Sequence, residues 1–305
     1  MREPRVVPDV EPASYYGRPI LKAPVWKQPD VPLYLYLGGV AGASAVLAEG
    51  AALTGRPALE RVTRLAAAAG AGLGTVALVH DLGRPERFLN MLRVFKPTSP
   101  LSVGSWILAP FGGLAAGAAL SEVTGRLPWL GRLAGAGAGL LGPALATYTG
   151  ALISNTAVPA WHAAYREMPF LFAGSASTAA AGIALIGTPV DEAGPARRLA
   201  VVGAGVEIVA AELLLNRLGM VGEPYRQGRP GRFMKTARNL TIAGVATALL
   251  GRRSRSLAVA AGASFQAASV LTRFAVFQAG LASAKDPKYT VVPQRERIRE
   301  RTLAG

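Results

Sequence analysis

Long apolar stretches, separated by short polar and basic segments, run through most of the 305-residue chain. Each stretch is about 15 to 26 residues long and nearly free of charge. A helix needs about 20 apolar residues to cross the hydrocarbon core of a bilayer, and it satisfies its backbone hydrogen bonds internally. The pattern therefore predicts an all-α integral membrane protein with eight transmembrane helices. They are expected at residues 31–53, 62–81, 103–121, 134–155, 169–187, 198–218, 237–251 and 256–281.

Composition agrees with this pattern. Hydrophobic residues make up 51% of the chain and charged residues only 17%, whereas about a quarter of a typical soluble domain is charged. The first 30 residues are polar and rich in proline and do not resemble a cleavable signal peptide. We therefore expect the first apolar stretch to insert the chain. An aromatic belt at the span ends is expected to include all four tryptophans: Trp26, Trp106, Trp129 and Trp161.

Basic residues set the expected orientation. Eight crossings put both termini on one side, and the segments on that side carry about twice as many Lys and Arg residues as the other loops. The positive-inside rule then places both termini in the cytoplasm and the protein in the cell (inner) membrane. The net charge of +15 is spread over these loops, so it does not indicate a nucleic-acid partner.

One basic hexapeptide occurs twice, as GRPERF at 83–88 and as GRPGRF at 228–233. The two copies lie four predicted helices apart and therefore on the same side of the membrane. A parallel duplication produces this arrangement, with two bundles related by an axis along the membrane normal. Two unrelated basic loops would explain the charge but not the shared Gly, Pro and Phe. The sequence thus predicts two four-helix bundles related by a parallel pseudo-repeat.

The repeat also suggests a division of the chain and a docking face. Proline fixes the turn, and the paired arginines can reach lipid phosphates or the carboxylates of a docked partner: Arg84, Arg87, Arg229 and Arg232. We expect four regions: a cytoplasmic N-terminal docking segment at 1–30, a first four-helix bundle at 31–155, a second at 156–281, and a basic cytoplasmic tail at 282–305.

The residue inventory limits the chemistry. The chain has no cysteine, so it cannot hold an iron–sulfur cluster through thiolates or attach haem covalently. Its two histidines, His80 and His162, lie in different connections near span ends, which argues against a bis-histidine haem. No catalytic triad or metal-ligand spacing is present. The sequence predicts a subunit without haem, without a metal site and without catalytic residues for a primary substrate.

Polar side chains gather at one end of the predicted first bundle. A quinone head group needs donors for its carbonyl oxygens, a titratable group and apolar walls. His80 is expected to deliver protons with help from the neighbouring carboxylate of Asp81. Interfacial tyrosines and a capping aspartate would be the structural alternative. The candidate quinone-binding residues are Asp30, Tyr34, His80, Asp81, Tyr148 and His162.

The predicted second bundle contains charged residues inside its spans: Glu207, Glu212 and Arg273. Charges within the hydrocarbon are costly, so they usually form pairs or line a hydrated path. A buried ion pair between Glu207 and Arg273 is one interpretation. A proton pathway through the three residues is the other.

Several segments together resemble the polysulfide reductase membrane subunit, the NrfD/PsrC-type anchor of molybdoenzyme complexes. They are YYGRPILKAPVW (15–26), YLYLGGVAGASAVLA (34–48), HDLGRPERFLNMLR (80–93), SPLSVGSW (99–106) and YTGALISNTAVPAW (148–161). The resemblance covers much of the first half of the chain, while the second half is matched mainly by GRPGRF and helix count.

The resemblance implies an eight-helix fold of two four-helix bundles with a quinone site near the membrane surface. It also implies a ferredoxin-like [4Fe-4S] partner subunit that serves a molybdopterin (Mo or W) catalytic subunit. Tyr148 stands where the family has a quinone-pocket tyrosine. Tyr34 stands where some members have histidine and Val31 where they have asparagine, so Asp30 is expected to substitute. Some members have periplasmic partner subunits.

The resulting hypothesis is a quinone-reactive membrane-anchor subunit of a respiratory oxidoreductase. It would pass electrons between the [4Fe-4S] partner and menaquinone or ubiquinone, next to membrane lipid. The substrate of the complex (formate, polysulfide, nitrite or arsenite) is not encoded in this chain. Two alternatives remain open: a secondary transporter built from duplicated four-helix bundles, and a purely structural anchor.

Overall fold

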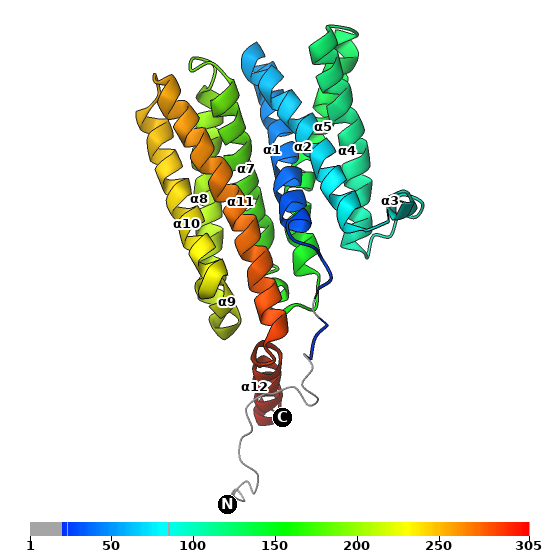
Figure 1. Cartoon of the computed structure of the whole chain (residues 1–305), viewed down its shortest axis with the longest axis vertical. Helices are drawn as coiled ribbons and strands as arrows, with labels where there is room; N and C mark the ends of the chain where they lie inside the picture. Colours follow the sequence, from blue (N-terminus) through cyan, green and yellow to red (C-terminus); the bar gives the residue numbers. More distant parts are fainter. Residues whose placement is uncertain (1–19, 23, 85, 305) are drawn as a thin grey trace, which may run out of the picture.

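The computed structural model describes residues 20–22, 24–84 and 86–304, and this part of the chain folds into helices without any β-strand (Figure 1). Eight helices have 20 residues or more: α1 (Asp30–Leu53), α2 (Pro57–Asp81), α4 (Pro100–Thr124), α5 (Pro128–Ser154), α7 (Met168–Gly187), α8 (Gly194–Arg217), α10 (Gly228–Leu250) and α11 (Arg255–Lys285). Shorter helical segments connect or follow them: α3 (Glu86–Met91), α6 (Pro159–Ala163), η1 (Gly219–Gly222), α9 (Glu223–Arg226) and α12 (Lys288–Ala304).

Seven of the long helices are apolar enough to cross a membrane, and together they make this a multi-pass membrane protein. The exception is α10, whose first half is strongly basic. The predicted all-α membrane class is confirmed, whereas the count of eight spans stays a prediction. The basic residues in the first half of α10 are Arg229, Arg232, Lys235 and Arg238.

Proline explains why several helices begin earlier than the apolar stretches do. Pro57, Pro100 and Pro128 each occupy the first position of a long helix. Proline is favoured there because its fixed φ suits a helix and its missing N–H would have no helical partner. The second long helix consequently starts five residues before the predicted span at 62–81 and takes charged residues into its first turns.

The long helices pack as two groups of four, with both described chain ends at the same end of the molecule (Figure 1). We call this end the terminal face. In each group the first helix contacts the second and fourth, and the third contacts the second and fourth. The groups meet mainly through α1, α5, α7 and α11. The helices therefore contact one another in the same order in both groups. Duplication of a bundle would produce this arrangement, but the pseudo-repeat itself stays a prediction.

Glycines allow equivalent helices to cross closely in both groups. A Cβ added to Gly42 of α1 would collide with the backbone of Gly142 on α5. Likewise a Cβ on Gly182 of α7 would lie 2.8 Å from the carbonyl oxygen of Gly262 on α11. Small residues at such crossings let helix backbones approach in a membrane, where packing rather than the hydrophobic effect drives association.

The two copies of the basic hexapeptide share a backbone feature. Their first glycines, Gly83 and Gly228, have positive φ angles of 68° and 59°. An L-residue with a side chain rarely adopts this conformation, so glycine is required at the turn. The first copy continues into the loop and α3, while the second opens α10 directly. Pro85 of the first copy lies outside the described residues.

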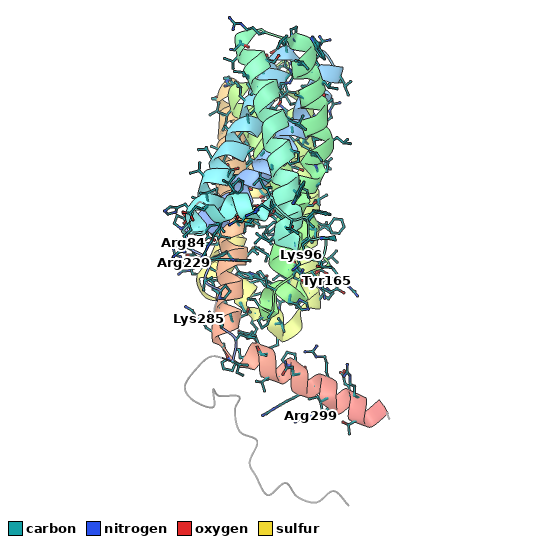
Figure 2. All side chains as sticks on the ribbon, turned by 90° about the vertical axis from the view of Figure 1, so that its right-hand side faces the viewer. Arg84, Lys96, Tyr165, Arg229, Lys285 and Arg299 are labelled. Carbon is teal, nitrogen blue, oxygen red and sulfur yellow. The ribbon has the colours of Figure 1, made fainter. Side chains whose placement is uncertain are left out.

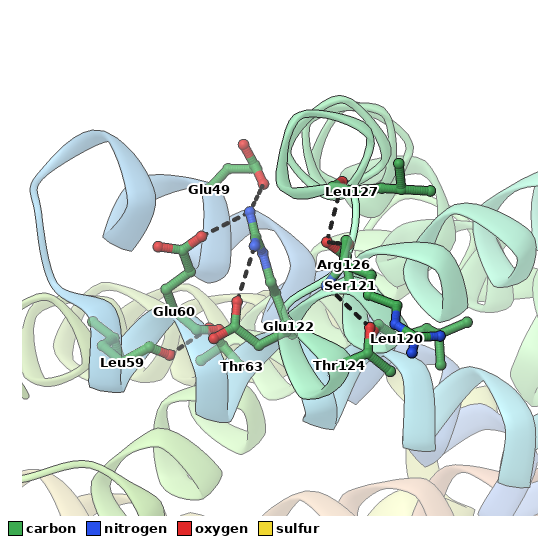
Figure 3. A network of polar contacts seen from close by, with 11 residues as sticks. Glu49, Leu59, Glu60, Thr63, Leu120, Ser121, Glu122, Thr124, Arg126 and Leu127 are labelled. Carbon is green, nitrogen blue, oxygen red and sulfur yellow. Dashed lines mark hydrogen bonds and ion pairs between the residues drawn. The ribbon is translucent and has the colours of Figure 1, made fainter.

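A buried arginine ties three helices together at the end opposite the terminal face. Arg64 of α2 is only 7% exposed. Its guanidinium lies 2.7 Å from Glu60, 3.1 Å from Glu122 of α4 and 3.9 Å from Glu49 of α1 (Figure 3). Carboxylates from three helices around one guanidinium indicate a structural clamp rather than a simple ion pair.

Trp161 joins the N-terminal segment to α11 of the second bundle. It is completely buried, its ring stacks on Trp26 with centroids 5.5 Å apart, and its Nε1 donates a 2.7 Å hydrogen bond to the carbonyl of Val276. The prediction that all four tryptophans form an aromatic belt is therefore wrong for Trp161. A buried indole gains both packing area and a hydrogen bond here, which the span-end position alone could not reveal.

A bidentate ion pair lies at the terminal face of the second bundle. Arg217, at the end of α8, donates from Nε and Nη2 to the two carboxylate oxygens of Glu167 at 2.6 and 2.5 Å. Nη2 also donates to the carbonyl of Ala163 at 2.6 Å. The hydrogen bonds from Arg217 lower the pKa of Glu167 below its usual 4.5.

We expect this pair to make stability pH-dependent. Since the folded-state pKa of Glu167 is depressed, its contribution is full above about pH 4.5 and is lost as the pH falls through the lower folded value. Replacing Glu167 with glutamine should cost about 1.5–3 kcal/mol at pH 7. Thermal unfolding from pH 7 to 3 measures this: the Glu167→Gln and unchanged proteins should converge at low pH. The exposed Glu296→Gln is the control, and parallel curves for Glu167→Gln would contradict the expectation.

Candidate functional site

The first candidate residues meet where α1 begins and α2 ends, on the terminal face. Nδ1 of His80 lies 2.8 Å from a carboxylate oxygen of Asp30. Because an ionised carboxylate can only accept, this bond places the proton on Nδ1 and leaves Nε2 free. The His80 side chain is 73% exposed, while that of Asp30 is 15% exposed. A partly buried carboxylate thus orients an accessible imidazole.

Asp81 has a different partner from the one that the sequence suggested. Its Oδ1 accepts a 2.8 Å hydrogen bond from the backbone N–H of Lys27, and Nζ of Lys27 donates to the carbonyl of His80 at 3.4 Å. The predicted pairing of His80 with Asp81 is therefore wrong, because consecutive helical side chains do not face each other. Asp81 instead fixes the N-terminal segment against the end of α2.

A surface groove of about 480 Å³ lies beside this pair. Val76 on its wall is 65% exposed on a helix that is apolar enough to cross a membrane, so the groove is in reach of lipid. The imidazole of His80 provides the main titratable group, and the two valines provide an apolar wall. The residues that line the groove are Lys27, Thr75, Val76, Val79, His80 and Gly83.

Two tyrosines form a second, buried pair one turn further along α1. The hydroxyls of Tyr34 and Tyr148 lie 2.5 Å apart, and the side chains are only 3% and 8% exposed. Gly104 of α4 makes this possible, since a Cβ at that position would overlap the Tyr148 ring. This explains the glycine in the SPLSVGSW segment, which the sequence alone did not. Tyr34 follows Asp30 by four residues, so the same face of α1 carries both pairs.

His162 lies apart from the other candidates. Its Nδ1 is 3.2 Å from the carbonyl oxygen of Ser154, across the short connection between α5 and α6. Of the six predicted quinone-site residues, the structure therefore pairs four: Asp30 with His80, and Tyr34 with Tyr148. Asp81 holds the neighbouring backbone, and His162 bridges a turn.

The charged residues of the second bundle do not form the expected buried ion pair. Within the described part of the chain, Glu207 and Arg273 do not approach within 4.0 Å. Glu207 accepts hydrogen bonds from Thr272 at 2.9 Å and from Thr178 at 3.4 Å. The threonines satisfy the carboxylate locally, so the pairing interpretation is wrong.

Arg273 makes its own contacts at the junction of the two bundles. It is completely buried and donates to the carbonyls of Leu35 on α1 at 3.3 Å and Phe172 on α7 at 3.0 Å. Its guanidinium also lies 3.9 Å from the centre of the Phe172 ring. Planar geometry and weak hydration suit arginine to such a buried, stacked position. One side chain on α11 thereby joins the first helices of both bundles.

The remaining charged candidates are more exposed. Glu212 forms an ion pair with Arg238 of α10, and both side chains are partly open to the surroundings. The four arginines of the hexapeptides are exposed, and Figure 2 places Arg84 and Arg229 at about the same level toward the terminal face. Arg229 lies over the ring of Phe233 at 5.2 Å, which gives a role to the shared phenylalanine.

Several residues of these networks had no role in the sequence-based prediction: Lys27, Arg64, Gly104, Thr178 and Thr272. Threonine and glycine in apolar spans give no signal by composition, since they equally serve helix packing. Only Arg64 could have been singled out, as a charge within a predicted span.

Comparison with models of known protein families shows to which family this chain belongs. A family model described as "Polysulphide reductase, NrfD" matches residues 21–215, which is well over half of the chain. The chain belongs to this NrfD family. The family assigned from the sequence motifs is thus confirmed, and the protein is a membrane subunit of a redox enzyme complex. A search of curated proteins returns no match.

The NrfD match covers part of the structure. It contains the whole first bundle, including both candidate pairs, and continues through α7 and most of α8. The helices α10 and α11 follow the matched residues. Within the described residues there is no cluster of three or more side chains that could hold a metal ion.

Proposed function

We propose that this chain is the quinone-reactive membrane anchor of a respiratory oxidoreductase. It would carry electrons between a [4Fe-4S] partner subunit and menaquinone or ubiquinone in the membrane. One observation carries the proposal: the accessible imidazole of His80, oriented by Asp30, lines a groove on a membrane-crossing helix. Membership of the NrfD family supports it.

The residues at the groove fit a quinone head group. Its volume of about 480 Å³ exceeds that of one aromatic ring, and Val76 and Val79 offer an apolar surface for the tail. Bound quinone would supply two-electron, two-proton chemistry. Nε2 of His80 would hold a quinone oxygen and exchange a proton there, while Asp30 keeps the imidazole oriented.

The buried tyrosines would take part in proton handling next to the groove. Tyr34 and Tyr148 share one short hydrogen bond and lie one helical turn deeper than Asp30. A phenol hydroxyl can both donate and accept, so the pair can move a proton without leaving a buried charge. Asp81 would serve the site by holding Lys27 in place, whereas His162 fixes the turn after α5, outside the groove.

The terminal face is the proposed docking surface for the partner subunits. The exposed Arg84, Arg87, Arg229 and Arg232 would meet carboxylates of the ferredoxin-like subunit. A molybdopterin catalytic subunit would connect through that subunit. Most of the expected docking segment 1–30 lies outside the described residues. We place this face in the cytoplasm, in the inner membrane, from the distribution of basic residues.

The division of the chain into bundles at 31–155 and 156–281 is part of the same proposal. The equal order of helix neighbours, the glycine crossings and the two hexapeptide turns support a parallel pseudo-repeat. We assign a proton pathway to the second bundle, with Glu207 and Glu212 as carriers and Arg273 as the fixed charge at its inner end.

Purification from native membranes tests the function. The chain should co-isolate with an iron–sulfur protein and contain extractable quinone. A lone chain with transport activity would favour a transporter, and a complex that neither contains nor reduces quinone would favour a purely structural anchor.

The two histidines provide a matched comparison within that complex. We expect His80→Ala to slow quinone turnover about tenfold, the equivalent of one lost hydrogen bond. His162→Ala, which changes a turn outside the groove, should have little effect. Dye-linked activity of the catalytic subunit is measured in parallel and should stay constant. Equal effects of the two substitutions would remove His80 from the site.

A further inference from the structure

A second cavity, of about 310 Å³, lies in the second bundle between α8 and α10. Among neighbouring helices of that bundle, these two form the loosest contact. Eight of the fifteen lining residues are polar or charged, although most of the lining surface is apolar, and the cavity has room for on the order of ten water molecules. It is distinct from the groove beside His80, which is formed by the first bundle and the N-terminal segment.

The inner end of the cavity is polar and buried. Glu207 is 5% exposed, and Thr241 and Thr272 are 1% and 2% exposed. In the described part of the chain the hydroxyl of Thr241 has no hydrogen-bond partner. A buried hydroxyl that lacks a protein partner is usually satisfied by water. Thr241 therefore indicates that the inner end is hydrated.

The outer end of the cavity leads to the terminal face. Tyr225 and Arg226 line it from α9, and Gly231 and Lys235 line it from the first turns of α10. Thr241 is 13 residues beyond the start of α10, about 20 Å along the helix. The cavity thus connects the terminal face with the interior of the bundle. The ion pair between Arg238 and Glu212 lies on its wall.

Beyond Glu207 the helices close. One turn further from the terminal face, Gly203 of α8 packs against α7 so closely that an added Cβ would lie 2.9 Å from the carbonyl oxygen of Gly174. The charges and polar groups that face Glu207 are Ser175 and Thr178 on α7, Thr272 and Arg273 on α11, Thr241 and Arg238 on α10, and Glu212 on α8 itself. This backbone contact leaves no room for a side chain between α7 and α8 next to the carboxylate.

We infer that the α8–α10 cavity is a water-filled half-channel that opens on the terminal face and ends at Glu207. Water and protons reach the carboxylate from that side, past Glu212 and Arg238, and the contact between Gly174 and Gly203 seals the other side. The inference deepens the proposed proton pathway by naming its route and direction. Its test measures water access and does not depend on quinone turnover.

The absence of cysteine from the chain makes thiol labelling a direct test. Thr241→Cys places a thiol at the inner end of the cavity. Ala248→Cys is the matched control, since it is seven residues further along the same helix and equally buried at 1% exposure. A small, charged, membrane-impermeant thiol reagent is added to sealed vesicles of both orientations that contain the whole complex. Mass spectrometry of this chain then gives the labelled fraction.

Thr241→Cys should be labelled at least tenfold faster than Ala248→Cys, and only from the terminal face. Labelling from the opposite face, or equal labelling of both positions, would overturn the half-channel. Labelling of Thr241→Cys by a lipophilic maleimide but not by the charged reagent would show that lipid fills the cavity and would also overturn it. Labelling after denaturation controls for thiol content. Quinone turnover of the unsubstituted complex is recorded separately, so absent turnover with the expected labelling pattern counts against the quinone proposal alone.

Discussion

Electron transfer to quinone is expected to slow about 100-fold when Tyr148 is replaced by phenylalanine, a size typical of one lost acid–base group. The substitution removes the hydroxyl that lies 2.5 Å from the hydroxyl of Tyr34 and leaves the ring in place against Gly104. Dye-linked activity of the catalytic subunit should stay constant, because its active site lies in another chain. Steady-state rates with a soluble quinone and with a dye measure the two activities.

A double-mutant cycle sharpens this prediction. If Tyr34 and Tyr148 act as one proton-handling unit, Tyr34→Phe should slow quinone turnover as strongly as Tyr148→Phe, and the double variant should be no slower than either. Tyr165→Phe is the control, because it removes the same atom from a side chain that is 52% exposed. Unchanged quinone turnover in Tyr148→Phe would exclude the pair from the site, and strictly additive effects would separate the two hydroxyls.

The largest loss of stability is expected for Arg273→Ala, about 3–5 kcal/mol. Arg273 is fully buried, stacks on Phe172 and donates to backbone carbonyls of α1 and α7. Alanine would leave a cavity at the junction of the two bundles and two carbonyls without their extra donor. Unfolding of the purified complex in a detergent series, followed by circular dichroism, measures the change.

Two further variants test why Arg273 stabilises the protein. Arg253→Ala removes an exposed arginine from the turn before α11 and should change stability by less than about 0.5 kcal/mol. Glu207→Gln in the Arg273→Ala background should not restore stability, because the carboxylate is held by threonines. Restoration would mean that the two side chains are an ion pair after all, and a loss below about 1 kcal/mol for Arg273→Ala would contradict its role as a link between bundles.

The sequence predicted the class of fold because the dominant signal was one-dimensional. Apolar stretches of membrane-spanning length identify helices without any knowledge of their neighbours. Only α10 falls short, since its first half carries the basic residues of GRPGRFMKTAR. Motifs such as HDLGRPERF and SPLSVGSW also identified the NrfD family before any geometry was known. Gly83 and Gly228 show that part of the hexapeptide reflects a backbone turn.

The sequence alone could not predict which polar side chains contact one another. His80 pairs with Asp30 rather than with Asp81. The start of α1, with Asp30, lies beside the end of α2, with His80, whereas the side chains of the consecutive residues His80 and Asp81 point in different directions. Glu207 binds threonines instead of Arg273, since small polar residues on neighbouring helices are closer than the guanidinium.

Helix length and apolar spacing are local properties, so the chain by itself determined that it is an all-helical membrane subunit without cysteine ligands. Rotation and depth of each helix depend on close crossings such as Gly42 with Gly142. Only the tertiary structure could decide which polar groups face one another, and where a cavity reaches a buried carboxylate, because both are set by contacts between distant segments.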